Sequence, residues 1–382
     1  MPLLLAVLLS QAVHGWVDAF FGLNTNRPAD GASFLPGTGT TARRANEFSL
    51  NVAALDLAAD PKPVGFHLTL AAGSGVDVLH SGEPAGPGIG AQVFRVIYQA
   101  SVSWAAPVGA GLLLEAGIYP SHIGYESFFS KDNVNYTRSW MGEYSPYYQT
   151  GIKASYVFDL HWSAQLHLMN GWNLIGDNNH SKAVGTQLQW TNDRATIALN
   201  TFAGPELPGD DSHWRLFGDL TAQLRATAAL SLGATLDVGW QDRAAGAAVW
   251  HGAGIYGRYA FSDAVGLALR AEYYDDRDGF MSGTAQLLTD GTVTLEVRPA
   301  EHLILKLEGR EDVSDAAVFT THRGTSRTQT LAIASAALLS KGLRRSSPRP
   351  SRWPRRGAGL RAAAGGRRRG IAAQSPYVKS RR

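Results

Sequence analysis

The stretch LILKLEGRED, residues 303–312, separates apolar from charged side chains by strict alternation. Its odd-numbered positions up to 307 are leucines, and its even-numbered positions from 306 onward are Lys, Glu, Arg and Asp. Successive side chains of a β-strand point to opposite faces, so this segment has one apolar face and one densely charged face. A soluble sandwich buries the apolar face against a second sheet. A transmembrane barrel turns that face to lipid and the charged face to a watery lumen.

The same alternation recurs along most of the chain. Several of the segments reach ten or more residues, which is the length that a tilted membrane strand needs. A repeat of about 20 residues over roughly 325 residues predicts about 16 strands, within 14 to 18, and bacterial barrels have an even number. The predicted strands are 48–54, 66–70, 94–104, 148–158, 162–170, 184–190, 195–203, 216–224, 230–240, 249–259, 265–274, 292–298, 303–312 and 328–339.

Aromatic residues favour the membrane barrel over the sandwich. Trp104, Trp162, Trp190, Trp240 and Tyr259 lie near ends of predicted strands, where the aromatic girdles of a membrane barrel occur. In a sandwich they would be ordinary core residues, but a sandwich rarely has so many long strands with large charges on one face. The sequence therefore predicts an all-β protein, a single antiparallel transmembrane β-barrel.

Composition agrees with this fold and excludes some sites. The 382 residues include no cysteine, which rules out disulfides and thiolate metal sites, and a closed barrel has no free edge to protect. No uninterrupted apolar run approaches the 18 residues of a helical span. The net charge of +3 averages two unlike parts: residues 341–382 hold fourteen Lys and Arg and no acid, which leaves 21 basic and 32 acidic residues in 1–340.

The N-terminal run PLLLAVLL has the length of a signal-peptide core. We predict a secretory signal in residues 1–15 and the barrel in residues 16–340, although the run lacks a preceding Lys or Arg. The alternative is a buried first strand.

The predicted lumen wall carries charges of both signs. Its candidate pore-lining residues, taken from the inward parity of the predicted strands, are Arg95, Glu115, Lys153, Arg270, Glu272, Lys306, Glu308 and Arg310. Opposite charges two residues apart, as in Arg270 and Glu272, would set up a field across the lumen. Paired wall charges would equally serve to wet the lumen and to pair neighbouring strands.

One connection, residues 120–146, is too long for a turn, and long loops are usually functional. It contains Glu126, Asp132 and Arg138 among many aromatic residues. In a porin such a loop folds inward and constricts the lumen; the alternative is an external surface loop.

Signals for catalysis or metal binding are weak. The segment GAGIYG, residues 252–257, matches a dinucleotide fingerprint with Glu272 downstream, but too few residues follow it to form the required helix, so glycines in a strand explain it better. Common hydrolase, phosphate-loop and zincin motifs are absent. The carboxylates of Glu272, Asp275, Asp276 and Asp278 suggest either a calcium site or an acidic external loop, and the missing twelfth-position Glu of an EF-hand favours the loop. We predict no metal, no cofactor and no catalytic residues.

Short pieces of the sequence, in order over most of residues 17–335, match a known family, and NGWN at 170–173 is the most telling. The other pieces are VDAFF at 17–21, NTNRP at 24–28, GIYPSHIGYE at 117–126, NYTRS at 135–139, DNN at 177–179, RAE at 270–272, DGF at 278–280 and RED at 310–312. In these pieces the chain resembles the OmpL-like outer-membrane β-barrel porins. The resemblance implies an outer-membrane channel and brings no catalytic residues.

The C-terminal end departs from that family. Outer-membrane barrels normally end on a strand with a terminal aromatic residue, which the barrel-assembly machinery reads, whereas this chain continues past Leu339 into an Arg-, Gly-, Pro- and Ala-rich tail. That composition predicts disorder in residues 341–382. We interpret the tail as a frameshift or read-through product; the alternative is a basic extension that binds anionic lipid or lipopolysaccharide. Nucleic acid is disfavoured, since the tail has few stacking aromatics.

Together these features predict a bacterial outer-membrane porin, a passive channel for small hydrophilic solutes, with a mild preference for cations because the body is acidic. Expected partners are outer-membrane lipid, lipopolysaccharide, the barrel-assembly machinery and further copies of the chain. One alternative is a non-conducting surface barrel, an adhesin or structural protein plugged by residues 120–146. Another is a barrel enzyme such as a phospholipase.

Overall fold

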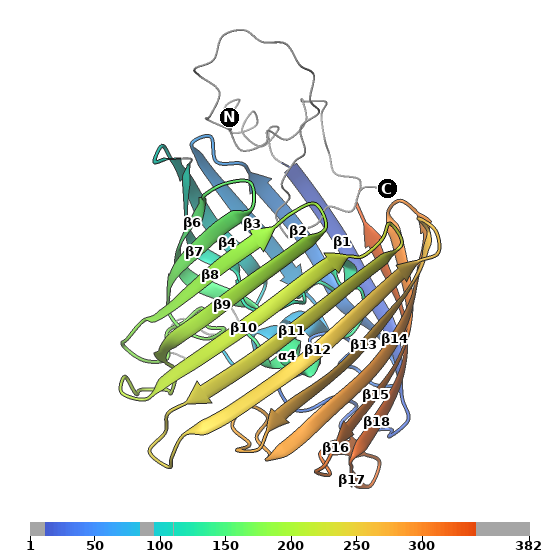
Figure 1. The fold of residues 1–382 in the computed structure, drawn as a ribbon. Coiled ribbons are helices and arrows are strands. Elements are labelled where there is room, and N and C mark those ends of the chain that lie inside the picture. Colours follow the sequence, from blue (N-terminus) through green and yellow to red (C-terminus); the bar gives the residue numbers. More distant parts are fainter. Residues whose placement is uncertain (1–11, 85–94, 110, 341–382) are drawn as a thin grey trace, which may run out of the picture.

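The chain forms a closed antiparallel barrel of 16 strands, as the alternation predicts (Figure 1). The structure is a computed structural model that describes residues 12–84, 95–109 and 111–340. Each barrel strand pairs with the barrel strand before it and the one after it in the chain. β1 closes the cylinder by pairing with β18, and Trp16 lies opposite Leu339. Closure leaves no unpaired edge.

The described residues form the barrel strands, a short separate hairpin and short helical elements. In chain order, the barrel strands are β1 (Ala12–Asn24), β2 (Phe48–Ala59), β3 (Val64–Ala72), β4 (Ile97–Ala106), β5 (Leu112–Pro120), β6 (Tyr148–Val157), β7 (Trp162–Met169), β8 (Ala183–Thr191), β9 (Ala195–Pro205), β10 (Trp214–Arg225), β11 (Leu230–Gln241), β12 (Ala248–Ala260), β13 (Val265–Asp276), β14 (Gln286–Ala300), β15 (Leu303–Ser314) and β18 (Thr328–Leu339). The hairpin joins β16 (Phe319–Thr321) to β17 (Gly324–Ser326). The helical elements are α2 (Ser74–Leu79), η1 (Ser130–Asp132) and α4 (Trp140–Tyr144).

The two ends of the barrel differ in the length of their connections. At the end where β1 begins and β18 finishes, the strands are joined by short turns such as residues 192–194 and 301–302. At the other end, the lower end in Figure 1, the connections are longer and include the β16–β17 hairpin. Outer-membrane barrels have short periplasmic turns and long extracellular loops, so the lower end is the extracellular one.

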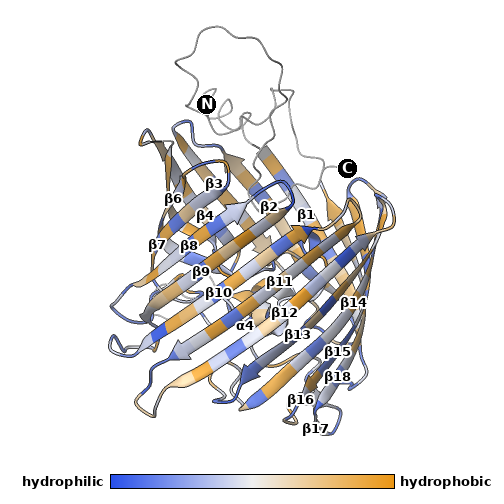
Figure 2. Cartoon of the chain, viewed as in Figure 1, coloured by the Kyte–Doolittle hydropathy of each residue, from blue (hydrophilic) through white to orange (hydrophobic). Residues whose placement is uncertain are grey.

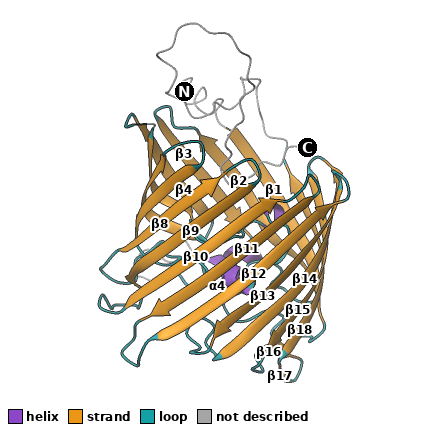
Figure 3. Ribbon diagram, in the orientation of Figure 1, coloured by secondary structure: helices purple, strands orange, loops and turns teal. Residues whose placement is uncertain are grey.

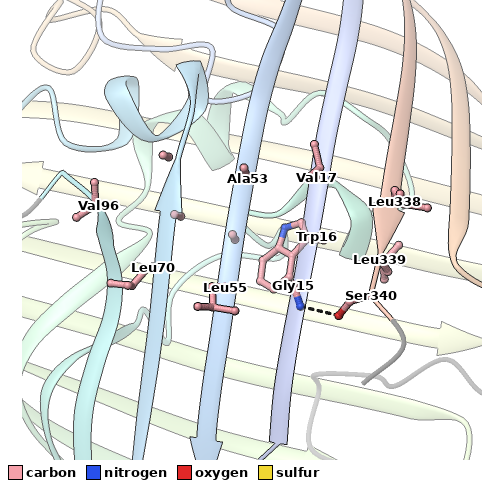
Figure 4. A pocket seen from close by; sticks show the side chains of 13 residues that line it. Gly15, Trp16, Val17, Ala53, Leu55, Leu70, Val96, Leu338, Leu339 and Ser340 are labelled. Atoms are coloured by element: carbon pink, nitrogen blue, oxygen red, sulfur yellow. Dashed lines mark hydrogen bonds between the residues drawn. The ribbon is translucent and has the colours of Figure 1, made fainter. Parts of the chain in front are cut away.

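Apolar and polar residues alternate along the strands (Figure 2), and many of the side chains exposed on the barrel strands are large and apolar. Leu303, Leu305 and Leu307 point outward, whereas Lys306 and Glu308 point inward and are buried. Exposed aromatic residues gather near both rims: Trp104, Trp162 and Tyr259 toward the periplasmic end, Trp214 and Phe48 toward the extracellular end. A shallow apolar groove crosses the outer face of β1–β3 and β18, where small residues such as Ala53 and Gly15 lie between Leu55 and Leu338 (Figure 4).

Two barrel strands were not predicted, and two begin three or more residues from the predicted start. β1 and β5 were missed, because β1 follows a leader-like apolar run and β5 opens with three leucines and has no clear alternation. β14 begins at Gln286, earlier than predicted, and β4 begins at Ile97, later than predicted, beside a register shift at Thr69/Leu70.

The predicted domain boundaries can be compared with the structure only within the described residues. β1 begins at Ala12, so the last residues of the predicted signal already pair with β2. The remainder of that segment, residues 1–11, and the basic tail, residues 341–382, lie outside the described residues. Within the described residues, no helix is long and apolar enough to cross a membrane.

Candidate functional site

The connection from β5 to β6, residues 121–147, folds into the barrel, and we name it the inner loop. Its helix α4 lies inside the cylinder against β12 and β13 (Figure 3). Ser139 caps this helix, since its hydroxyl accepts the N–H of Gly142 at 2.9 Å. Of the two alternatives for this connection, the inward-folded loop is therefore the observed one.

The outbound half of the inner loop follows the wall in strand order. Each contact joins a loop residue to an inward-facing group on a strand further around the barrel. The contacts are His122 Nε2 with Thr201 O of β9 (3.0 Å), Gly124 N with Asp219 Oδ2 of β10 (2.7 Å), Glu126 Oε1 with Arg270 Nη1 of β13 (3.2 Å) and Ser130 Oγ with Asp18 Oδ2 of β1 (2.6 Å).

Carboxylates of the wall bind the backbone of the returning half. Glu308 of β15 accepts the N–H groups of Tyr136 (2.5 Å) and Thr137 (2.9 Å). Glu272 of β13 accepts the N–H of Trp140 at 2.6 Å. Hydrogen bonds to a charged acceptor are stronger than neutral ones, so each carboxylate holds a segment of loop that has no ladder partner.

Wall cations bind the backbone carbonyls of the same segment. Lys306 Nζ donates to the carbonyls of Ser130 (2.9 Å) and Asn133 (2.6 Å), and Arg270 Nη1 donates to that of Thr137 (2.6 Å). The N–H and C=O groups of the loop thus find acidic and basic partners on the wall. A buried loop would otherwise leave these groups unsatisfied.

The wall charges also pair with one another across β13–β15. Asp290 lies between two arginines, 2.9 Å from Arg270 Nη2 and 2.8 Å from Arg310 Nε. Arg310 reaches Asp312 as well, at 2.7 Å, and donates to the carbonyl of Arg138 in the loop. Five of the predicted pore-lining residues thus point inward but are covered by the loop, with only 2–7% of each exposed: Arg270, Glu272, Lys306, Glu308 and Arg310.

Glycines of β12 receive a side chain of the inner loop. A Cβ at Gly252 would lie 2.8 Å from Met141 Cγ, and one at Gly254 would lie 2.8 Å from Met141 Cε. The match to a dinucleotide fingerprint is therefore part of a barrel strand, and its first two glycines make room for Met141 of α4.

On the β5–β8 side some inward side chains are less covered, although Gln149 and His167 there are buried. Glu115 and Lys153 form an ion pair at 2.6 Å with side chains 12% and 15% exposed, and Gln165 is also half-buried. Ser101 donates to Glu115 at 2.6 Å. Glu115 and Lys153 are the predicted wall residues that the inner loop leaves partly exposed.

The three predicted constriction residues have different surroundings. Glu126 and Arg138 are held within the loop: Glu126 accepts the Ser139 N–H at 2.8 Å, and Arg138 donates to the Ser127 carbonyl at 2.8 Å. Asp132 is exposed at the tip, where it contacts Lys131 at 2.7 Å. Only Asp132 projects into free volume.

The prediction for Arg95 was wrong. Arg95 precedes β4 instead of lying on its inward face, and it is exposed and paired with Asp77 of α2 at 2.9 Å. Other interior charges were missed. Asp18 and Asp290 lie in parts of strands that the alternation did not predict. Asp219 and Asp237 lie at inward-facing positions of predicted strands, but no charged residue stands two positions away to draw attention to them.

The acidic residues near the β13 end do not converge on one point. Asp276 accepts the N–H groups of Phe280 (2.9 Å) and Ser282 (2.7 Å), and Asp278 accepts that of Val249 (2.8 Å). Among the described residues no group of three or more potential ligands is arranged to hold a metal ion.

At the extracellular rim, two carboxylates hold the connection 170–182, which contains the NGWN sequence. Glu83 accepts the N–H of Ile175 at 2.7 Å, and Glu206 accepts that of Trp172 at 2.7 Å. Burial raises the pKa of Glu206 to about 7. Asn173, with φ +55°, accepts the Tyr147 N–H at 2.9 Å and so ties this connection to the end of the inner loop.

The sequence of almost the whole barrel matches a known protein family. Residues 10–339 match the family model described as "Putative beta-barrel porin-2, OmpL-like". The chain belongs to this family. Its members are outer-membrane β-barrels of the porin type, and this places the chain in the bacterial outer membrane.

Solved porin structures share the fold at low identity. OmpF of Salmonella typhi, in a complex with daunomycin, aligns with TM-score 0.60 and 10% identity over 86% of this chain and 97% of that one. The channel DcaP of Acinetobacter baumannii aligns with TM-score 0.59 and 9% identity over 86% of this chain and 97% of that one. An anion-selective porin from Comamonas acidovorans aligns with TM-score 0.58 and 11% identity over 87% of this chain and 99% of that one. Comparison with curated proteins gives no sequence match.

Proposed function

We propose that the protein is a passive diffusion channel for small hydrophilic solutes. The observation that carries the proposal is the uneven covering of the inner wall. The start of the inner loop contacts β8–β10 and the rest is fastened to β13–β15 and β1, while the inward pair Glu115–Lys153 of β5 and β6 remains partly exposed. Solutes pass between the loop and this uncovered side, and the wall charges there filter them.

The proposed filter has two parts. Glu115 and Lys153 line the wall at mid-height, and Asp132 projects from the tip of the loop together with Lys131. Gln165 extends the polar lining on β7, whereas Gln187 of β8 donates to the His122 carbonyl of the loop at 3.2 Å. In this assignment Arg270, Glu272, Lys306, Glu308 and Arg310 position the loop instead of touching the solute.

A conductance measurement tests the proposal. Refolded protein in planar bilayers should produce discrete current steps, and the protein should admit small sugars into liposomes. Absence of both would favour the other candidate, a plugged surface barrel. One observation supports that candidate: residues of the β1–β2 connection, among them Phe34, Leu35 and Ala42, are also buried inside the extracellular half.

We further propose a mild preference for cations, because residues 1–340 carry more acidic than basic groups. Reversal potentials under a salt gradient measure this preference, and clear anion selectivity would contradict it. No catalytic step enters the proposal; an assay for phospholipid hydrolysis by the refolded barrel checks this.

The proposed partners are those that the fold needs. The apolar outer face contacts lipid and lipopolysaccharide, and the groove over β1–β3 and β18 adds a surface on which acyl chains or another copy of the barrel pack (Figure 4). For the termini we retain a secretory signal and a tail foreign to the barrel as proposals. A chain that ends after Leu339 with a terminal Phe should assemble in vesicles better than the full chain; equal assembly would contradict this.

A further inference from the structure

Two carboxyl groups face each other on the inner wall. Asp219 of β10 and Asp237 of β11 occupy directly opposite positions in the ladder, and both point inward. They are 1% and 2% exposed. Side chains at directly opposite positions of an antiparallel pair are neighbours, so the two carboxyl groups lie side by side.

Partners of this pair come from both ends of the inner loop and from neighbouring strands. Asp219 accepts the N–H of Gly124 (2.7 Å), at the start of the loop, the side-chain amide of Asn200 of β9 (2.8 Å) and the hydroxyl of Thr235 of β11 (3.4 Å). Asp237 accepts the hydroxyl of Ser145 (3.3 Å), near the end of the loop, and its other oxygen has no partner.

This pair has no cationic partner. Asp290 lies between two arginines, whereas in the described part of the chain no lysine, arginine or histidine forms an ion pair with Asp219 or Asp237. Two ionised carboxylates side by side in a dry site repel strongly. Carboxyl pairs in such surroundings share one proton.

We propose that Asp219 and Asp237 hold one shared proton and act as positioning residues that latch the two ends of the inner loop to the wall. Loss of that proton leaves two like charges in contact and frees the loop around Gly124 and Ser145. The latch therefore opens as the pH rises, and acidification, which adds a second proton, leaves it closed.

The groups that face the pair reinforce this direction. From β13, Glu272 adds negative charge and Tyr274 lies on the same ladder row, opposite Gly252 of β12. From the inner loop, Tyr144 stacks on Tyr274 with ring centroids 5.0 Å apart. Arg215, the nearest cation on β10, stacks against Trp172 and Trp250. β9 contributes the uncharged Asn200 and the loop start contributes Tyr125.

Loop mobility tests the latch without relying on conduction. The chain has no cysteine, so Val134→Cys at the far end of the loop carries a single spin label on the full-length protein in lipid vesicles. Between neutral and alkaline pH we expect its spectrum to shift to narrower, mobile lines. In the Asp237→Asn background, where an amide replaces the protonated acid, that shift should disappear. Asp56→Asn, which alters an interior carboxylate bonded to His67, is the matched control and should keep it.

A spectrum that does not change with pH, or a shift that survives in Asp237→Asn, would overturn the proposal. If Asp237→Asn fails to fold, infrared spectroscopy of the unsubstituted chain decides. The carbonyl band of a protonated buried carboxyl should be present at neutral pH and lost at alkaline pH together with loop immobility. Its absence at neutral pH would overturn the proposal. Neither readout depends on current, so the latch and the channel can fail separately.

Discussion

The β13–β15 wall and the β5–β8 wall both carry inward charges of both signs, but these charges have different partners. On β13–β15, acids and bases bind the backbone of the inner loop and are almost fully buried. On β5–β8, Glu115 and Lys153 bind each other and remain partly exposed. The position of a residue in its strand determines which face its side chain occupies. The inner loop determines whether a charged side chain on the inner face is buried or exposed to water.

The physical reason is the set of unpaired groups that the loop brings inside. A loop within a barrel has no strand beside it, so its N–H and C=O groups need side-chain partners. Alternating Lys, Glu, Arg and Asp on β15 supply acceptors and donors at the two-residue spacing of the inner face. Glu115 and Lys153 lie opposite each other on β5 and β6 and compensate each other without the loop.

The largest effect is expected at a loop anchor. Glu308→Ala leaves two backbone N–H groups and the Thr294 hydroxyl without their acceptor in a buried site. We expect a loss of about 3–5 kcal/mol in the free energy of unfolding and a larger, noisier single-channel current. Urea denaturation in vesicles and bilayer recordings measure these. Glu301→Ala, in the exposed turn between β14 and β15, is the control and should change stability by less than about 0.5 kcal/mol.

The rim carboxylate predicts a pH effect of the next size. The pKa of Glu206 is raised from 4.5 to about 7, so the folded state holds its proton where the unfolded state has lost it. Its stabilising contribution is complete below pH 4.5 and is lost as the pH rises through 7, a change of about 3 kcal/mol. Glu206→Gln should remove this part of the stability–pH slope in denaturation curves. An unchanged slope would show that Glu206 does not titrate in this range.

A smaller effect is expected at Gly252 of β12, which lies against Met141 of the inner loop. In Gly252→Ala the new Cβ meets Met141 and the Tyr273 carbonyl, so we expect a loss of about 1–3 kcal/mol from overpacking. Gly291→Ala, on β14, meets nothing within 4 Å and is the matched control, with stability unchanged or slightly raised. Equal losses in the two variants would mean that Met141 does not seat on Gly252.

At the partly exposed β5–β8 wall we expect a charge substitution to change ion selectivity with little change in stability. In Lys153→Glu the proposed path gains negative charge beside Glu115, and the reversal potential under a salt gradient should move toward stronger cation preference. Lys182→Glu, at the exposed rim, is the control with a smaller shift. Identical shifts would place the filter elsewhere.

Alternation alone predicted the barrel, its strand number and the inward direction of Arg270, Glu272, Lys306, Glu308 and Arg310. It did not predict their contacts, because the partners of Glu308 are backbone groups more than 170 positions away in sequence. Local patterns carry no information on such pairs. The error at Arg95 has a different cause: a three-residue error in the start of β4 removes a side chain from the wall altogether.

The central claim, that solutes follow the β5–β8 wall and not the β13–β15 wall, is tested most directly by charge modification at single cysteines. A negatively charged methanethiosulfonate reagent applied to Lys153→Cys should change the single-channel current at once, while Thr294→Cys, beneath the loop and fully buried, should not respond. Current changes at Thr294→Cys with none at Lys153→Cys would contradict the account.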